Sequence, residues 1–540
     1  MQHRASANAD TERQRGAAVN DRPVNPWGAL AALCIGFFMI LLDATIVSIA
    51  IPAMLRGLNA SLNAVVWVTS IYLLTYAVPM LFTSRLGDRF GPKRVFMAGL
   101  VLFTLASLWC GLAGDVGTLI AARGVQGIGA ALMTPQTLSF ISFLFPPARR
   151  GAAMGVWGGI AGLATVTGPL LGGVLVDNFG WQWIFYVNVP IGVIAVVLGM
   201  ILVPDWRPGT AHAFDVPGIL LSGLGLLLVV FGLQNGQQYN WGEVWGGVTV
   251  FEIIAAGVVL LVAFVFWQRF NRREPLLPLH IFGNRNFSSG VLASVTVGFT
   301  MTGMFFPIVI YLQTVLGMTP LHAGLLTAPM SLLSGVVAPF AGRLSDKVNA
   351  KFLLVFGLVA LAAGLAWISL QVTPTTSPYA LIPALLLCGL GIGFIFSPMS
   401  AVTMGSVPRE LTGSASGIFN TARQVGGVLG SAAVGVLLQA RITASLAAST
   451  ADLPPQIRAG LSSAANVEGG APSDFGSVPD SVRQQVTDAI HSGLTTAAAQ
   501  TLWLPAAFLL LGALAALTMR TSRRVVRQAP EAAVSPTTGP

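Results

Sequence analysis

The stretch that decides the fold is WGALAALCIGFFMILLDATIVSIAIPAML, residues 27–55. At roughly 1.5 Å per residue, a helix of this length crosses a hydrocarbon core of about 30 Å. Asp43 stands near its middle, where an ionised side chain costs about 2.5–3.5 kcal/mol on insertion scales. Such an acid tends to face a bundle interior or a wet cavity, so its position favours a functional site. The alternative interpretation is a structural Asp43, satisfied by a neighbouring hydroxyl or carbonyl group.

The composition extends this prediction to the whole chain. Of the 540 residues, 54% are apolar and only 9% are charged, which is typical of a polytopic membrane protein built from helices. Cys34, Cys110 and Cys388 all fall in apolar stretches and indicate neither a disulfide framework nor a metal site.

Fourteen apolar stretches are candidate membrane spans. They lie roughly at 27–55, 64–83, 95–113, 118–143, 152–176, 181–203, 214–234, 245–267, 286–313, 320–341, 352–371, 378–400, 413–440 and 498–519. With the amino terminus in the cytoplasm, 23 of the 29 Lys and Arg residues fall on the inner side. This asymmetry follows the positive-inside rule. It predicts a protein of the cytoplasmic (inner) membrane with both termini cytoplasmic. The net charge of +9 is then explained by topology, and no nucleic-acid partner is expected.

Short motifs repeat along the chain. SRLGDR at 84–89 recurs as GRLSDK at 342–347, and GIG at 127–129 recurs at 391–393. The repetition predicts two six-helix halves with alternating access between them. The predicted parts are a tail at 1–26, a first half at 27–203, two extra helices within 204–285, a second half at 286–519 and a tail at 520–540. Residues 441–497 are predicted to form a flexible external loop without a folded domain, because they contain Pro-Pro and Gly-Gly pairs; short helices within it are the alternative.

Two arginines lie within spans. A guanidinium cannot be neutralised in practice, so Arg123 and Arg423 each need a partner or a wet cleft. We expect Arg123 to pair with polar groups of a neighbouring helix and to influence a nearby carboxylate. Met39, Gln126 and Arg423 are candidates to line a substrate cavity, and mere packing is the alternative interpretation. Glu252 lies nearer an outer end and is expected to reach the interface.

The inner loop LGDRFGPKR at 86–94 combines opposite charges with turn formers. Its charged residues are candidates for a conformational latch that is made in one state and broken in the other. They are Asp88, Arg89, Lys93 and Arg94, with Asp346 in the second copy. The alternative interpretation is a solvated loop that only sets topology.

A glycine-proline motif, TGPLLGG at 167–173, lies in the fifth predicted span. Gly168, Gly172 and Gly173 allow close helix packing, whereas Pro169 loosens the helical ladder and permits bending.

Together these motifs resemble those of the major facilitator superfamily, in particular the fourteen-span drug:proton antiporters of the EmrB/QacA type. The similar stretches include LDATIVSIAIP at 42–52, RGVQGIGAA at 123–131, TGPLLGG, WQWIFYVNVPIG at 181–192 and GSASGIFNTARQVGG at 413–427. The resemblance implies a major facilitator fold with two extra central helices. It also implies proton handling by Asp43, proton coupling by Arg123 and antiport through the Gly168–Gly173 motif. Span ten lacks the acid that some members use for cationic drugs.

Three classes of function are open to a chain of this kind. The first is proton-coupled efflux of amphipathic drugs by alternating access, driven by the proton gradient without a cofactor. The second is specific export of a metabolite or lipid on the same fold. The third, an ATP-driven pump or membrane enzyme, is disfavoured because none of the three lysines lies in a GxxxxGK[ST] loop. We therefore expect no enzyme activity. The expected partners are a lipophilic small molecule, protons and the bilayer, and no periplasmic adaptor is indicated.

Overall fold

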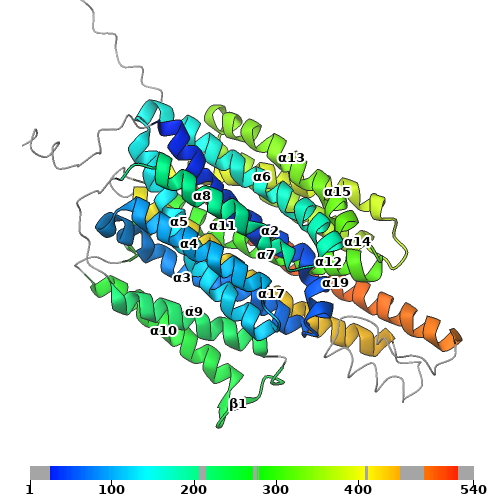
Figure 1. The fold of residues 1–540 in the computed structure, drawn as a ribbon. Coiled ribbons are helices and arrows are strands. Elements are labelled where there is room, and N and C mark those ends of the chain that lie inside the picture. The colour runs from blue at the N-terminus through cyan, green and yellow to red at the C-terminus, as the bar shows by residue number, and fades with distance from the viewer. Residues whose placement is uncertain are drawn as a thin grey trace, which may run out of the picture.

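The computed structural model is a bundle of long helices that run roughly along one axis (Figure 1). It describes residues 25–205, 215–236, 238–271, 276–277, 279–407, 412–449 and 480–520. Among them, thirteen helical stretches are long and apolar enough to cross a membrane. The remaining predicted span, 152–176, lies within one further helix of 33 residues. The predicted all-helical, multi-pass architecture is confirmed.

The first half contains seven helices. They are α2 (Pro26–Gly57), α3 (Leu62–Phe90), α4 (Pro92–Gly111), α5 (Val116–Leu144), α6 (Pro147–Phe179), α7 (Trp183–Tyr186) and α8 (Asn188–Leu202). Side-chain caps fix several starts; for example, Asn25 Oδ1 accepts from the amides of Trp27 and Gly28. Gly91 alone separates α3 from α4 and has φ of 96°, a conformation that glycine adopts without steric cost.

Two further helices, α9 (Val216–Asn235) and α10 (Val250–Phe270), form a hairpin beside α3 (Figure 1). The span predicted at 245–267 begins later, because a small antiparallel hairpin precedes it. Its strands are β1 (Glu243–Trp245) and β2 (Val248–Thr249). Gly246 and Gly247 both have positive φ, so they make the tight turn that a helix cannot accommodate. Glu252 closes a capping box with Thr249, which gives this intramembrane acid a structural role.

Asp215 holds the other end of the α9–α10 hairpin together. Its carboxylate accepts hydrogen bonds from Trp267 Nε1 at 2.7 Å, Gln268 Nε2 at 2.6 Å and the Gly218 amide at 3.0 Å. Burial alone raises the pKa of Asp215, but these hydrogen bonds lower it overall. The carboxylate therefore fastens the last turn of α10 to the first turn of α9.

The second half repeats the helical pattern with more interruptions. Its elements are η1 (Leu279–Gly283), α11 (Arg285–Gly303), α12 (Phe305–Ile310), η2 (Tyr311–Val315, a π-helical turn), α13 (Pro320–Lys347), α14 (Ala350–Gln371), η3 (Pro378–Leu381), α15 (Ile382–Gly393), α16 (Phe396–Met404), α17 (Thr412–Ser449) and α19 (Asp480–Leu517).

The predicted flexible loop at 441–497 is partly wrong. Helix α17 continues to Ser449 and α19 begins at Asp480, so both ends of the segment are helical. In α19, Ile490, Leu494 and Ala498 are buried at every fourth position, and this helical period outweighs the polar composition. The Pro-Pro and Gly-Gly pairs fall in 450–479, outside the described residues.

The two halves meet along two helix pairs, α6 with α13 and α3 with α17. The first contact is close, since a Cβ atom at Gly173 would lie only 2.7 Å from Leu321 Cα. At the second contact, the buried hydroxyls of Ser70 and Ser431 lie 2.7 Å apart. In each pair, one helix belongs to the first half and the other to the second half. These two pairs therefore form much of the interface between the halves.

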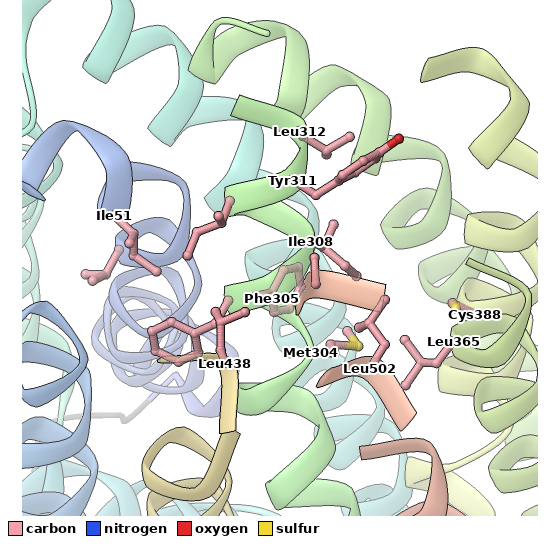
Figure 2. Close-up of a cluster of buried hydrophobic side chains, with 14 of the residues drawn as sticks. Ile51, Met304, Phe305, Ile308, Tyr311, Leu312, Leu365, Cys388, Leu438 and Leu502 are labelled. Atoms are coloured by element: carbon pink, nitrogen blue, oxygen red, sulfur yellow. The ribbon is translucent and has the colours of Figure 1, made fainter. Parts of the chain in front are cut away.

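Hydrophobic packing differs between the two ends of the bundle. We call the end that holds Pro26 and Arg520 the terminal end and the other the distal end. One large cluster joins both halves, and its members near the distal end include Ile51 of α2, Phe305 of α12 and Leu438 of α17 (Figure 2). Toward the terminal end, two smaller clusters are each built from one half. We call the arrangement in which the halves are joined through these distal residues the distally closed state.

A carboxylate of the first half also caps a helix of the second half at the distal end. Asp177 Oδ2 on α6 accepts a hydrogen bond of 2.9 Å from the Leu321 amide, in the first turn of α13. That amide is one of the N–H groups for which a helix start offers no backbone partner, and the helix dipole favours a negative charge there. Asp177 thus links the halves in the distally closed state.

We predict that Asp177→Asn shifts the protein toward distal opening. Loss of one exposed charge–dipole contact is worth about 0.3–1 kcal/mol, so the closed population should fall by roughly twofold to fivefold relative to the open one. Double electron–electron resonance between labels at Asn59 and Thr375 would measure the shift. Asn178→Ala is the matched control, because Asn178 bonds only within α6. Identical distance distributions for Asp177→Asn and wild type would contradict the prediction.

Candidate functional site

Asp43 lies in a closed polar cluster at the centre of the first half. Its side chain is 0% exposed and forms an ion pair with Arg123 of α5, which is 1% exposed. Asp43 also accepts hydrogen bonds from Gln126 Nε2 at 2.9 Å and Asn188 Nδ2 at 3.2 Å. The carboxylate therefore receives donors from three side chains on two other helices.

Arg123 is held on several sides. Its Nε donates to the Val68 carbonyl of α3 at 3.2 Å, and a terminal nitrogen donates to Gln126 Oε1 at 2.7 Å. The guanidinium carbon also lies 4.0 Å from the centroid of the Tyr72 ring, a cation–π geometry. These contacts fix the arginine so that it meets Asp43 without side-chain rearrangement.

Asn188 lies at the start of α8, directly after the short helix α7. Val187 alone lies between the two helices and keeps helical dihedral angles, with φ of −59° and ψ of −28°. Pro190 has no N–H to donate to the Tyr186 carbonyl four residues earlier, so the helical hydrogen-bond ladder is interrupted at this point. Ser107 then orients the amide: it lies 3.1 Å from Asn188 Nδ2 and donates to the Phe185 carbonyl at 2.9 Å. Sequence reasoning missed Asn188 and Ser107. A polar amide two residues before a proline in an apolar stretch was the available signal.

The energetics of this cluster depend on mutual compensation. Removing both charges from water costs several kcal/mol per ion, which the ion pair and its additional hydrogen bonds offset only when geometry is favourable. Here the pair is neutral overall and the carboxylate has three donors. Protonation of Asp43 would leave Arg123 as an uncompensated buried cation. The cluster can therefore couple proton binding to movement of the helices that carry it.

The glycine-proline motif places α6 directly against the helix that carries Asp43. A Cβ atom at Gly168 would lie 2.0 Å from Thr45 Oγ1, and one at Gly172 would lie 2.8 Å from Ile46 Cγ1. On the other side of α6, the Pro169 carbonyl oxygen lies 2.5 Å from a Cβ built at Gly324 of α13. The motif therefore packs α6 tightly between α2 and the second half.

The candidate latch residues lie away from this cluster. Lys93 Nζ donates to the carbonyls of Met200 and Val203 at 2.9 and 2.6 Å, and Arg94 lies 3.9 Å from Asp205. These contacts join α4 to the end of α8, within the first half. Arg89 lies over the adjacent Phe90 ring. The side chains of Asp88 and Asp346 fall outside those that the structure describes.

The three candidate cavity residues have different surroundings. Met39 is fully buried in a hydrophobic cluster of the first half, and Gln126 belongs to the Asp43–Arg123 cluster. Arg423 of α17 is partly exposed and lies beside Tyr76 of α3. Among the described residues, no three His, Cys, Asp or Glu side chains converge to hold a metal ion.

Helices of membrane-spanning length with a compensated charge pair between them define a multi-pass membrane protein. Residues 33–431 match the family model described as Major Facilitator Superfamily. The chain belongs to this superfamily, as the sequence motifs predicted.

Two relatives and one solved structure illustrate the relationship. The chain is 46% identical to an uncharacterized MFS-type transporter of Mycobacterium tuberculosis (strain ATCC 25618 / H37Rv), over 78% of this chain and 72% of that protein. It is 34% identical to the tetracenomycin C resistance and export protein of Streptomyces glaucescens, over 86% of each chain. A bacterial homologue of the human lysosomal transporter Spinster, solved inward-facing and unoccupied, has a TM-score of 0.60 at 17% identity, covering 92% of this chain and 99% of the other.

We predict that Arg123→Met destabilises the protein by about 3–5 kcal/mol, because it leaves a buried carboxylate without its partner. The Asp43→Asn/Arg123→Met double variant should recover much of this loss, since no charge remains buried. Thermal unfolding of the purified proteins in nanodiscs measures the stability of the single and double variants relative to wild type. The exposed Arg441→Met variant is the control. Equal stability of the single and double variants would contradict the prediction.

Proposed function

We propose that the protein exports amphipathic small molecules across the cytoplasmic membrane in exchange for protons. The single observation that carries this proposal is the closed cluster of Asp43, Arg123, Gln126 and Asn188. It is the one arrangement among the described residues in which a titratable acid lies wholly inside the bundle. The resistance and export role in the name of the Streptomyces relative supports export as the direction of transport.

In this proposal, Asp43 binds a proton when the distal side is open and releases it when the terminal side is open. A gradient can drive transport only if the proton affinity of the site differs between the two states. The ion pair with Arg123 stabilises the deprotonated acid in the distally closed state, which favours proton release on the terminal side. No cofactor is required, since the proton gradient supplies the free energy.

The motifs at the two interfaces receive roles in the same cycle. Tight packing of Gly168, Gly172 and Gly173 against α2 and α13 transmits a change at Asp43 to the interface between the halves. Lys93 and Arg94 hold α4 and α8 together as a rigid unit, and the last turns of α3 and α13, which carry Asp88 and Asp346, act as the state-dependent latch. We further propose that the transported molecule is lipophilic; the prevalence of apolar and aromatic side chains inside the described bundle supports this choice.

The transport proposal predicts that Asp43→Asn abolishes gradient-driven export while leaving the protein folded. Inside-out vesicles with an acidic lumen should accumulate the lipophilic dye N-phenyl-1-naphthylamine, and a protonophore should collapse the accumulation. Asn keeps the shape and hydrogen-bond acceptor of Asp43 but cannot titrate. Glu252→Gln is the matched control, because that acid only caps α10. Dye accumulation by Asp43→Asn at the wild-type level and with the same pH dependence would make Asp43 a structural acid.

The topology proposal predicts that the terminal end faces the cytoplasm. Reporter fusions after Gln439 and after Arg527 should report opposite compartments, the first periplasmic and the second cytoplasmic. The physical reason is the retention of Lys- and Arg-rich loops on the inner side. The same compartment for both fusions would mean that a span between them has been miscounted.

A further inference from the structure

Arg423 is a second arginine inside the bundle, and it differs from Arg123 in having no carboxylate. Among the described residues, no carboxylate lies within 4.0 Å of its guanidinium, and no side-chain hydrogen bond from it is formed. It stands eleven residues, or about 16 Å, from the start of α17 at Thr412. A permanently charged group at this depth needs an anion or a wet cleft.

The helix packing fixes the direction in which Arg423 points. Gly427, one turn further along the same face of α17, lies between the two halves: a Cβ there would be 3.0 Å from Thr302 Oγ1 of α11 and 3.6 Å from Leu73 Cδ1 of α3. The Arg423 side chain is also close enough to Tyr76 of α3 to interact with it electrostatically. Its guanidinium therefore lies at the interface between the halves rather than on the outer surface of α17.

Other polar groups gather at the same place. The Tyr76 hydroxyl lies 2.8 Å from Thr134 Oγ1, and the buried Gln424 lies beside it. A permanent cation, an amide and hydroxyl groups form a donor-rich surface that is complementary to a carboxylate, sulfonate or phenolate.

We propose that Arg423 binds an anionic group on the transported molecule, so that the preferred substrates are amphipathic anions. This inference rests on the proposed export function and adds the charge class of the substrate. The apolar surroundings receive the hydrophobic part, and the guanidinium supplies a charge-assisted hydrogen bond that a neutral analogue cannot accept. A purely structural arginine would instead affect charged and neutral ligands alike.

Equilibrium binding to the full chain in phosphatidylcholine nanodiscs tests the proposal. The matched probes are 1-anilinonaphthalene-8-sulfonate and N-phenyl-1-naphthylamine, which differ by the sulfonate. Wild type should bind the sulfonate more tightly. Arg423→Gln should weaken sulfonate binding about tenfold or more and change binding of the neutral probe less than about twofold. Arg423→Lys should retain an intermediate preference, because it keeps the charge but loses the planar fork.

Arg441→Gln is the control for net charge, because it removes one exposed cation from the same helix. Asp43→Asn should keep the sulfonate preference while it loses gradient-driven export, so a failure of proton coupling is distinguishable from a failure of anion binding. Parallel loss of both probes in Arg423→Gln would show a structural arginine and overturn the proposal. So would an unchanged sulfonate affinity, or a wild-type protein without a preference for the sulfonate.

Discussion

The structure depends on the ion pair between Asp43 and Arg123. Each charge alone would be costly inside an apolar bundle, and together they are compensated by Gln126, Asn188, the Val68 carbonyl and the Tyr72 ring. The pair therefore positions four helices of the first half around one point. Loss of either charge would therefore remove a contact that all four helices share.

The same pair explains the need for close packing around it. Helix α2, which carries Asp43, is contacted by glycines of α6 that leave no room for a larger side chain. On its opposite face, α6 contacts α13 of the second half. Because α6 is tightly packed on both faces, a small displacement of α2 would also displace α6. Movement of α6 would in turn shift its contact with α13, which lies at the interface between the halves.

Much of the fold could be predicted from the sequence, because membrane spans are marked by length, apolarity and the distribution of Lys and Arg. Asp43 and Arg123 were also identifiable, since isolated charges in apolar stretches are rare. Their pairing was expected only conditionally, because it depends on how α2 and α5 pack. Asn188 was missed because its role follows from contacts with Asp43 of α2 and Ser107 of α4, which depend on how α8 packs against both helices. The helical ends of the 441–497 segment were missed because polar composition concealed a four-residue burial period.

Helix α9 contacts both α3 of the first half and α17 of the second. Its polar attachment is on one side, where Asn63 donates to Asn235 and Gln238 at 3.0 and 3.1 Å. With Asp215 joining α9 to α10, the hairpin is a rigid attachment to the first half. Any relative movement of the two halves would therefore carry this hairpin with α3 and slide it along α17. The extra helices thus extend one edge of the interface between the halves.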